Sequence, residues 1–183
     1  MKRLLTITSF VLLFSALFVV AAGAGANQGR RPTYGMWTGT DYFVGPCPDT
    51  TNFPPGAFLV VNIGQGVMTH IGKSSFIAVG CVYFTSETSL EGSGWMIVTA
   101  SNGDTLHVST ESTNDLSVIP GRWTEHETVV GGTGRFEGAS GETDTEGIFI
   151  TVTDPFPFGE SIFPELFQSP SAWIGTTEGW VRY

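Results

Sequence analysis

Hydrophobic and polar residues alternate along most of the chain after residue 30, in short runs that end at Gly, Pro, Asn or Asp. A period of two places successive side chains on opposite faces of a β-strand. No window in this region carries apolar residues at the helical spacing i, i+3, i+4 and i+7 over three turns. Many short strands with turn signals between them predict an all-β domain, an antiparallel barrel or a sandwich. The strands are expected at 34–40, 57–63, 66–72, 75–84, 93–100, 104–110, 122–130, 134–138, 145–153 and 172–182.

One hairpin can be placed from its turn. The pair Asn102-Gly103 accepts the positive φ angles of a type I′ turn. His107 is then expected on the mixed face of the hairpin, turned toward solvent. The apolar face is predicted to consist of the opposed pairs Ser101–Asp104, Thr99–Leu106, Ile97–Val108 and Trp95–Thr110.

Two segments interrupt the alternation. Residues 44–56 form a Pro-rich loop, and residues 154–170 contain four Phe and four Pro. A segment this rich in aromatic residues is expected to pack on the rest of the domain. It is predicted either to cover one end of the barrel or to act as a lid over a ligand cavity. The candidate lid residues are Phe156, Phe158, Phe163 and Phe167.

The first residues have the pattern of an export signal. Lys2 and Arg3 precede a long apolar run that ends in small residues suited to cleavage after Ala24 or Ala26. The prediction is a signal peptide over 1–26 and one secreted or periplasmic β-barrel domain over 27–183, without stable membrane insertion after cleavage. The alternative is an uncleaved membrane anchor, because the run approaches spanning length.

Charge and cysteine content indicate which partners and which compartment the protein is suited to. Residues 27–183 keep six of the eight basic residues against seventeen acidic ones, a net charge of about −11. Such a surface repels polyanions, so nucleic acid is not an expected partner. In an oxidising compartment Cys47 and Cys81 are expected to form a disulfide, although two buried thiols are the alternative.

The glycine-rich stretch "GGTGRFEGASGE" over 131–142 has neither the Lys-Ser/Thr of a phosphate loop nor the spacing of a dinucleotide fingerprint. Its glycines suit a strand, a tight turn and a second short strand at a barrel corner. Arg135 is expected to pair with a carboxylate there. The predicted corner consists of Gly131, Gly132, Gly134, Gly138 and Gly141.

The segment "VVGGTGRFEGASGE" resembles the glycine signature of the allene oxide cyclase and dirigent-like barrel superfamily. "MTHIGKSSF", "TASNGDTL" and "TEGWVRY" further resemble a group of uncharacterised exported bacterial proteins that share this signature. The resemblance implies a single antiparallel eight-stranded β-barrel with a partly apolar interior, often oligomeric. A calycin-like barrel or a β-sandwich is the alternative. The catalytic residues of the plant enzymes lie outside the shared signature, so none is transferred.

Few residues suggest a catalytic or metal-binding role. The three histidines lack metal-binding spacing, and no nucleophile elbow or calcium loop is present, so neither a metal nor a cofactor is predicted. His70 alternates with Met68 along a predicted strand, where a structural hydrogen bond is the favoured role. Glu125 and Glu127 share a face and could perform acid–base chemistry in a cavity. A solvated outer face is favoured for them, because burying two carboxylates is costly.

Three functions follow as hypotheses. The first is an exported barrel that binds a small hydrophobic molecule in its interior, as an eight-stranded barrel can. The second is a cyclase-like or isomerase-like enzyme that uses the same cavity. The third is a structural or interaction domain with a packed interior. A homo-oligomer is possible in each case.

Overall fold

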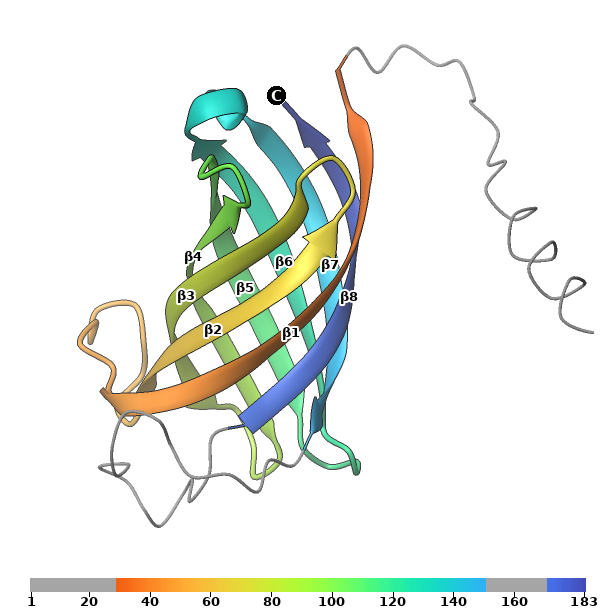
Figure 1. Cartoon of the computed structure of the whole chain (residues 1–183). Coiled ribbons are helices and arrows are strands. Elements are labelled where there is room, and N and C mark those ends of the chain that lie inside the picture. Colours follow the sequence, from red (N-terminus) through yellow and green to blue (C-terminus); the bar gives the residue numbers. More distant parts are fainter. Residues whose placement is uncertain (1–28, 151–170) are drawn as a thin grey trace, which may run out of the picture.

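The alternating pattern folds into eight long strands that close into one barrel (Figure 1). The computed structural model describes residues 29–150 and 171–183. Every strand pairs antiparallel with its neighbours in sequence, and the last strand pairs with the first. The prediction of an all-β, eight-stranded antiparallel barrel is thereby confirmed. The elements are β1 (Arg31–Pro46), β2 (Phe58–Met68), β3 (Gly72–Phe84), β4 (Ser89–Ala100), β5 (Thr105–Asp115), β6 (Arg122–Gly132), the 3-10 helix η1 (Gly134–Phe136), β7 (Ser140–Ile150) and β8 (Ser171–Arg182).

Two of the ten expected strands are not separate strands. The segments 57–63 and 66–72 form the single strand β2, because Gly64 and Gly66 continue the ladder. Their missing side chains make room for aromatic rings: a Cβ at Gly64 would lie 2.5 Å from the ring of Phe76. The segment 134–138, expected as a strand, is the η1 turn.

The hairpin between β4 and β5 differs from its prediction by one residue. Ala100 pairs with Asp104 across a three-residue loop, and Gly103 ends that loop at a φ of 88°. This is a common hairpin loop in which a left-handed glycine follows a turn. Because a shift of one residue moves a whole strand to the other face, the predicted pairs are wrong. The interior receives Met96, Val98 and Ala100 with Leu106 and Val108, while Trp95 and Ile97 face outward.

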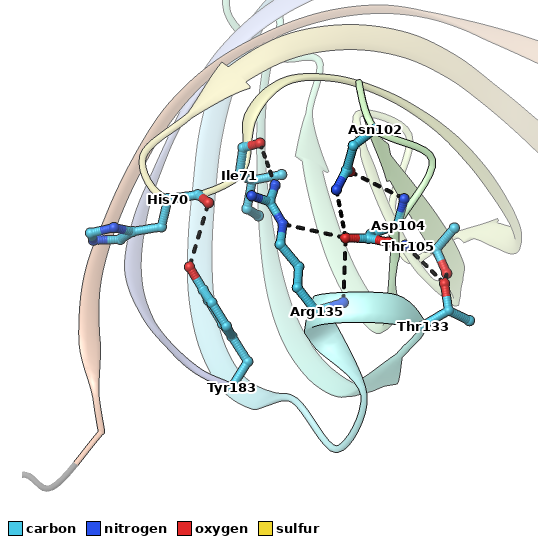
Figure 2. A network of polar contacts seen from close by, with 8 residues as sticks. All are labelled: His70, Ile71, Asn102, Asp104, Thr105, Thr133, Arg135 and Tyr183. Carbon is cyan, nitrogen blue, oxygen red and sulfur yellow. Dashed lines mark hydrogen bonds and ion pairs between the residues drawn. The ribbon is translucent and has the colours of Figure 1, made fainter.

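The 3-10 helix η1, the β2–β3 turn and the β4–β5 loop lie at the same end of the barrel, which we call the η1 end (Figure 1). Phe136 is fully buried there and packs against Tyr183 with ring centroids 5.0 Å apart. Arg135 links the three segments: its guanidinium donates to the Ile71 carbonyl at 2.9 Å and pairs with Asp104 (Figure 2). The carboxylate partner expected for Arg135 is therefore present.

The disulfide between Cys47 and Cys81 is present. Cys81 lies on the outward face of β3, where it is buried by the loop over 47–57. The Cys47 amide donates to the Ala57 carbonyl at 2.8 Å, which closes this loop at its base. The bridge thus holds the Pro-rich loop against the outside of the barrel, without entering the interior.

The interior is divided into two parts along the barrel axis. Toward the η1 end, apolar side chains such as Met68, Val98, Leu106 and Val181 form a packed core. Toward the opposite end, which carries the β1–β2 and β5–β6 loops, the interior holds a cavity; we call it the cavity end.

Candidate functional site: a cavity in the barrel interior

A cavity of about 420 Å³ occupies the interior at the cavity end. This volume lies within the range of small-molecule sites in proteins. Inward-facing residues of every strand contribute to it, together with the β5–β6 loop. Its lining combines apolar groups such as Phe43, Val60, Ala78, Leu90 and Phe149 with the polar groups Asp41, Asn62, Thr110, Ser112 and Glu125.

Asp41 enters the cavity from β1. It continues the inward alternation of Trp37 and Gly39, so the period of two along β1 sets the direction of its side chain. Burial raises the pKa of Asp41 to about 7, and a hydrogen bond from the Trp173 indole acts in the opposite direction. A carboxyl group with this pKa exchanges its proton near neutral pH, as acid–base chemistry requires.

Glu125 enters from β6, beside Trp123. Burial raises the pKa of Glu125 to about 8, and the nearby Glu127 and Asp41 add to this by charge repulsion. A hydrogen bond from the Thr110 hydroxyl lowers it in part. At neutral pH the Glu125 carboxyl is mainly protonated, so it can donate a hydrogen bond to a molecule in the cavity.

Glu127 lies one layer deeper, between the cavity and the packed core. It is 5% exposed, and its carboxyl accepts from Thr143 at 2.5 Å and from Thr145 at 2.7 Å. Thr145 in turn pairs with the Thr177 hydroxyl. Burial raises the pKa of Glu127, and the threonine hydroxyls offset this in part. This satisfied network forms a polar floor beneath the cavity.

Two polar atoms at the cavity have no hydrogen-bond partner among the described residues. They are Asn62 Oδ1, an acceptor, and Trp123 Nε1, a donor. Buried polar atoms are paired in the large majority of cases, so each unpaired one calls for an explanation. Both residues line the cavity, where a bound molecule could pair them.

Aromatic rings connect the cavity to the core. Trp123 and Trp173 meet edge to face with centroids 4.8 Å apart, and Trp173 stacks on Phe76 at 5.8 Å. Inward glycines allow this: a Cβ at Gly39 would lie 2.5 Å from the Trp173 ring, and one at Gly147 would lie 2.6 Å from that of Trp123. The rings give the cavity a rigid, apolar wall.

The structure separates the three polar candidates. Glu125 and Glu127 lie together inside the barrel, so the expectation of a solvated outer face was wrong. The cost of burial is reduced by raised pKa values and threonine hydrogen bonds, and the outer face of β6 carries Arg122 and His126 instead.

His70 lies in the exposed β2–β3 turn at a φ of 65°, with its carbonyl accepting from Tyr183 at 3.4 Å (Figure 2). It is neither half-buried in a strand nor near the carboxyl groups.

The glycine stretch lies at the η1 end, away from the cavity. Gly131, Gly134 and Gly138 have φ angles of 152°, 59° and 70°, which favour glycine. Gly132 and Gly141 allow close approach instead: added Cβ atoms would lie 2.2 Å from the Thr105 carbonyl oxygen and 2.3 Å from that of Trp180. The stretch shapes the closed end of the barrel.

Sequence reasoning missed Asp41, Asn62 and Trp173. Their signal was available as an inward alternation: Trp37, Gly39 and Asp41 share a face, as do Asn62 and Gly64. The candidate lid residues Phe156, Phe158, Phe163 and Phe167 lie outside the described residues, as does the predicted signal peptide.

Neither a family model nor a curated protein matches this chain. Over residues 29–150 and 171–183, no group of three or more His, Cys, Asp or Glu side chains is arranged to hold a metal ion. The same residues include no helix of the length and apolarity that crossing a membrane requires.

Proposed function

We propose that this protein binds one small, largely apolar molecule inside the barrel, at the cavity end. The observation that carries the proposal is the cavity of about 420 Å³, in which unpaired buried polar atoms of Asn62 and Trp123 meet an aromatic wall. Binding sites typically combine an apolar lining with a few polar groups that orient the ligand.

The entrance supports the same function. Leu116, Val118 and Ile119 of the β5–β6 loop line the cavity at its end, and Ile119 is 99% exposed. Apolar residues at the mouth favour the entry of an apolar molecule, since they give it partners before it reaches the interior.

We place this binding outside the cytoplasm. The disulfide between Cys47 and Cys81 is typical of oxidising compartments, and the N-terminal sequence has the pattern of an export signal. We propose membership of the allene oxide cyclase and dirigent-like superfamily on the resemblance of the glycine stretch. This membership agrees with a barrel that binds hydrophobic small molecules.

A second candidate is an isomerase or cyclase that uses the same cavity. It is favoured by the carboxyl groups of Asp41 and Glu125, whose pKa values of about 7 and about 8 suit proton transfer at neutral pH. A carrier releases the molecule that it took up, whereas an enzyme releases an isomer. To distinguish the two, a molecule extracted from the purified protein is incubated with fresh protein. Mass spectrometry and NMR then show whether the recovered molecule is the same compound or an isomer of it.

The binding proposal is tested with the uncharged fluorescent probe phenylnaphthylamine. We expect saturable binding of one probe per chain, with energy transfer from tryptophan, because Trp123 and Trp173 line the cavity. The folded state is checked by circular dichroism in the same samples. Folded protein that shows no saturable binding would have a packed interior in solution, and the structural or interaction domain would then be the better explanation.

A further inference from the structure

The described residues that line the cavity include two carboxyl groups, those of Asp41 and Glu125, and no Lys, Arg or His side chain. Glu127, on the inner face of the same strand as Glu125, is a further ionisable group that acts on Glu125, and it is acidic as well. Asp41 otherwise faces Asn62 and Trp173, and Glu125 faces Thr110, all of them uncharged.

Hydrogen-bond acceptors also outnumber free donors around Asp41. Asn62 lies directly opposite Asp41 in the β1–β2 ladder, so their side chains are neighbours on the inner face. The Asn62 oxygen is buried without a donor. The Trp173 indole and the Thr110 hydroxyl are already engaged by Asp41 and Glu125. A ligand group that brings several N–H donors to this point would satisfy acceptors that the protein leaves open.

The aromatic wall suits a cation as well. Trp123 and Trp173 lie beside the two carboxyl groups, and indole faces attract ammonium groups, more strongly where water is excluded. Trp123 is 7% exposed and its Nε1 donor is unpaired, so the same site can accept one ligand oxygen.

We propose that the molecule bound in this cavity is an organic amine: a protonated amino group beside Asp41, Asn62 and Glu125, attached to an apolar or aromatic body that lies against Trp123 and Trp173. This rests on the proposed binding function and specifies its ligand class. A carboxylate ligand is repelled by Asp41 and Glu125 wherever these are ionised, and it brings no donor for Asn62. A neutral alcohol can pair with Asn62 but brings a single donor and no positive charge to Asp41.

The proposal is tested with three probes of similar size: naphthylethylamine, naphthylethanol and naphthylacetate. Titration calorimetry gives the affinity of each and, from buffers with different ionisation enthalpies, the protons exchanged. We expect the amine to bind at least tenfold more tightly than the alcohol at about pH 8 and to release protons on binding. Between about pH 6 and about pH 8 a group with a pKa of about 7 changes from about one-tenth to about nine-tenths ionised, so amine affinity should rise about tenfold.

Variants locate the effect. Asp41→Asn and Glu125→Gln keep the size and one acceptor oxygen of each side chain and remove its negative charge, so each should reduce the preference for the amine over the alcohol. Glu111→Gln, on the exposed outer face of β5, is the matched control and should leave the preference unchanged. Thermal unfolding of each variant verifies that it is folded.

The outcomes separate the two proposals. Equal or tighter binding of the alcohol or of naphthylacetate, or an amine preference that persists in both cavity variants, would overturn the amine proposal and leave the binding function intact. If no probe, phenylnaphthylamine included, binds the folded protein, both proposals fail.

Discussion

Glu127 shows how the barrel interior alters a single ionisable side chain. A buried carboxylate loses its hydration, so the protonated form is favoured and the pKa rises. The hydroxyls of Thr143 and Thr145 hydrogen-bond to the Glu127 carboxyl, which keeps its polar atoms paired. The residue is therefore tolerated inside a core because burial favours its protonated form and its neighbours are hydroxyl groups that pair with it.

The raised carboxyl pKa values predict that the protein is more stable in mild acid. The folded state holds protons on Asp41 and Glu125 up to pKa values of about 7 and about 8, whereas the unfolded chain releases them near the ordinary pKa values of 3.8 and 4.5. The stabilisation is complete below the unfolded pKa values and is lost as pH rises through the folded ones. We expect the midpoint of thermal unfolding to fall steadily between about pH 5 and about pH 8.5.

Two variants test which carboxyl groups cause the fall of the melting temperature with pH. Glu127→Gln and Glu125→Gln remove a titrating group and retain its size, so each should flatten the dependence of the melting temperature on pH. Glu111→Gln, which changes an exposed carboxylate, should leave it unchanged. A melting temperature that rises over this range in the parent protein would contradict the prediction.

Gly138 separates backbone strain from steric crowding. Its φ is 70°, and nothing lies within 4 Å of the position that a Cβ would take. Gly138→Ala should therefore cost only the left-handed backbone penalty, about 1–2 kcal/mol in urea unfolding. Gly138→Asn should cost less, because Asn visits this conformation more readily. Equal stability of the parent and Gly138→Ala would show that the turn relaxes.

Gly134 provides the comparison for this test. Its φ is 59°, but a Cβ there would lie 1.9 Å from the Asp104 carboxyl. Gly134→Ala should cost more than Gly138→Ala, because it also disturbs the contacts between Asp104 and Arg135 at the η1 end (Figure 2).

At the scale of elements, the sequence predicted the class of fold and most strand positions but not which face of a strand is buried. In the β4–β5 hairpin both faces carry apolar residues, so the choice depended on one residue of loop length at Ser101 to Gly103. In β6, Trp123 and Val129 indicated the inner face, but Glu125 and Glu127 share it. The transfer cost of a carboxylate suggested solvent, while the threonine hydroxyls that reduce this cost come from the neighbouring strands, Thr110 of β5 and Thr143 and Thr145 of β7.

The candidate site was harder to predict than the fold for the same reason. Asp41 and Asn62 are adjacent only because β1 and β2 pair in a particular register. Glu125 joins them from across the barrel, which requires closure of β8 on β1. Local sequence patterns contain neither relation. The glycine stretch, by contrast, has its geometry within twelve consecutive residues, and its role in shaping the chain could be predicted.

The disulfide is predicted to stabilise the barrel by connecting an outside loop to β3. It closes a chain segment of 34 residues between Cys47 and Cys81. The double variant Cys47→Ala/Cys81→Ala should lose about 3–4 kcal/mol of unfolding free energy, mainly because the unfolded chain gains freedom. Urea unfolding measures this, and reduction of the parent protein by dithiothreitol should give a similar loss. A loss below about 1 kcal/mol in both experiments would mean that the loop over 47–57 is held in place by its packing.

At the scale of the whole molecule, the barrel is closed at one end and hollow at the other. Eight strands enclose a space that side chains can fill or that can hold one small molecule. Here Phe136 and the surrounding apolar residues fill the η1 end, while small residues such as Ala78, Gly80 and Ser112 leave space at the cavity end. The homo-oligomer remains a prediction, and sedimentation velocity can test it by measuring the size of the protein in solution.

This asymmetry predicts opposite effects of one substitution at two positions. Ala78 lines the cavity, whereas Ala100 is 3% exposed in the packed core. A phenyl ring at Ala78 can enter existing space, so Ala78→Phe should change the unfolding free energy by less than about 1 kcal/mol and weaken phenylnaphthylamine binding at least tenfold. Ala100→Phe forces extra volume into a filled core and should cost about 1–3 kcal/mol, with binding by the molecules that remain folded unchanged. Urea unfolding and fluorescence titration measure the two effects. Similar destabilisation by both substitutions would show that the cavity end is as closely packed as the η1 end, and the interior would then have no room for a ligand.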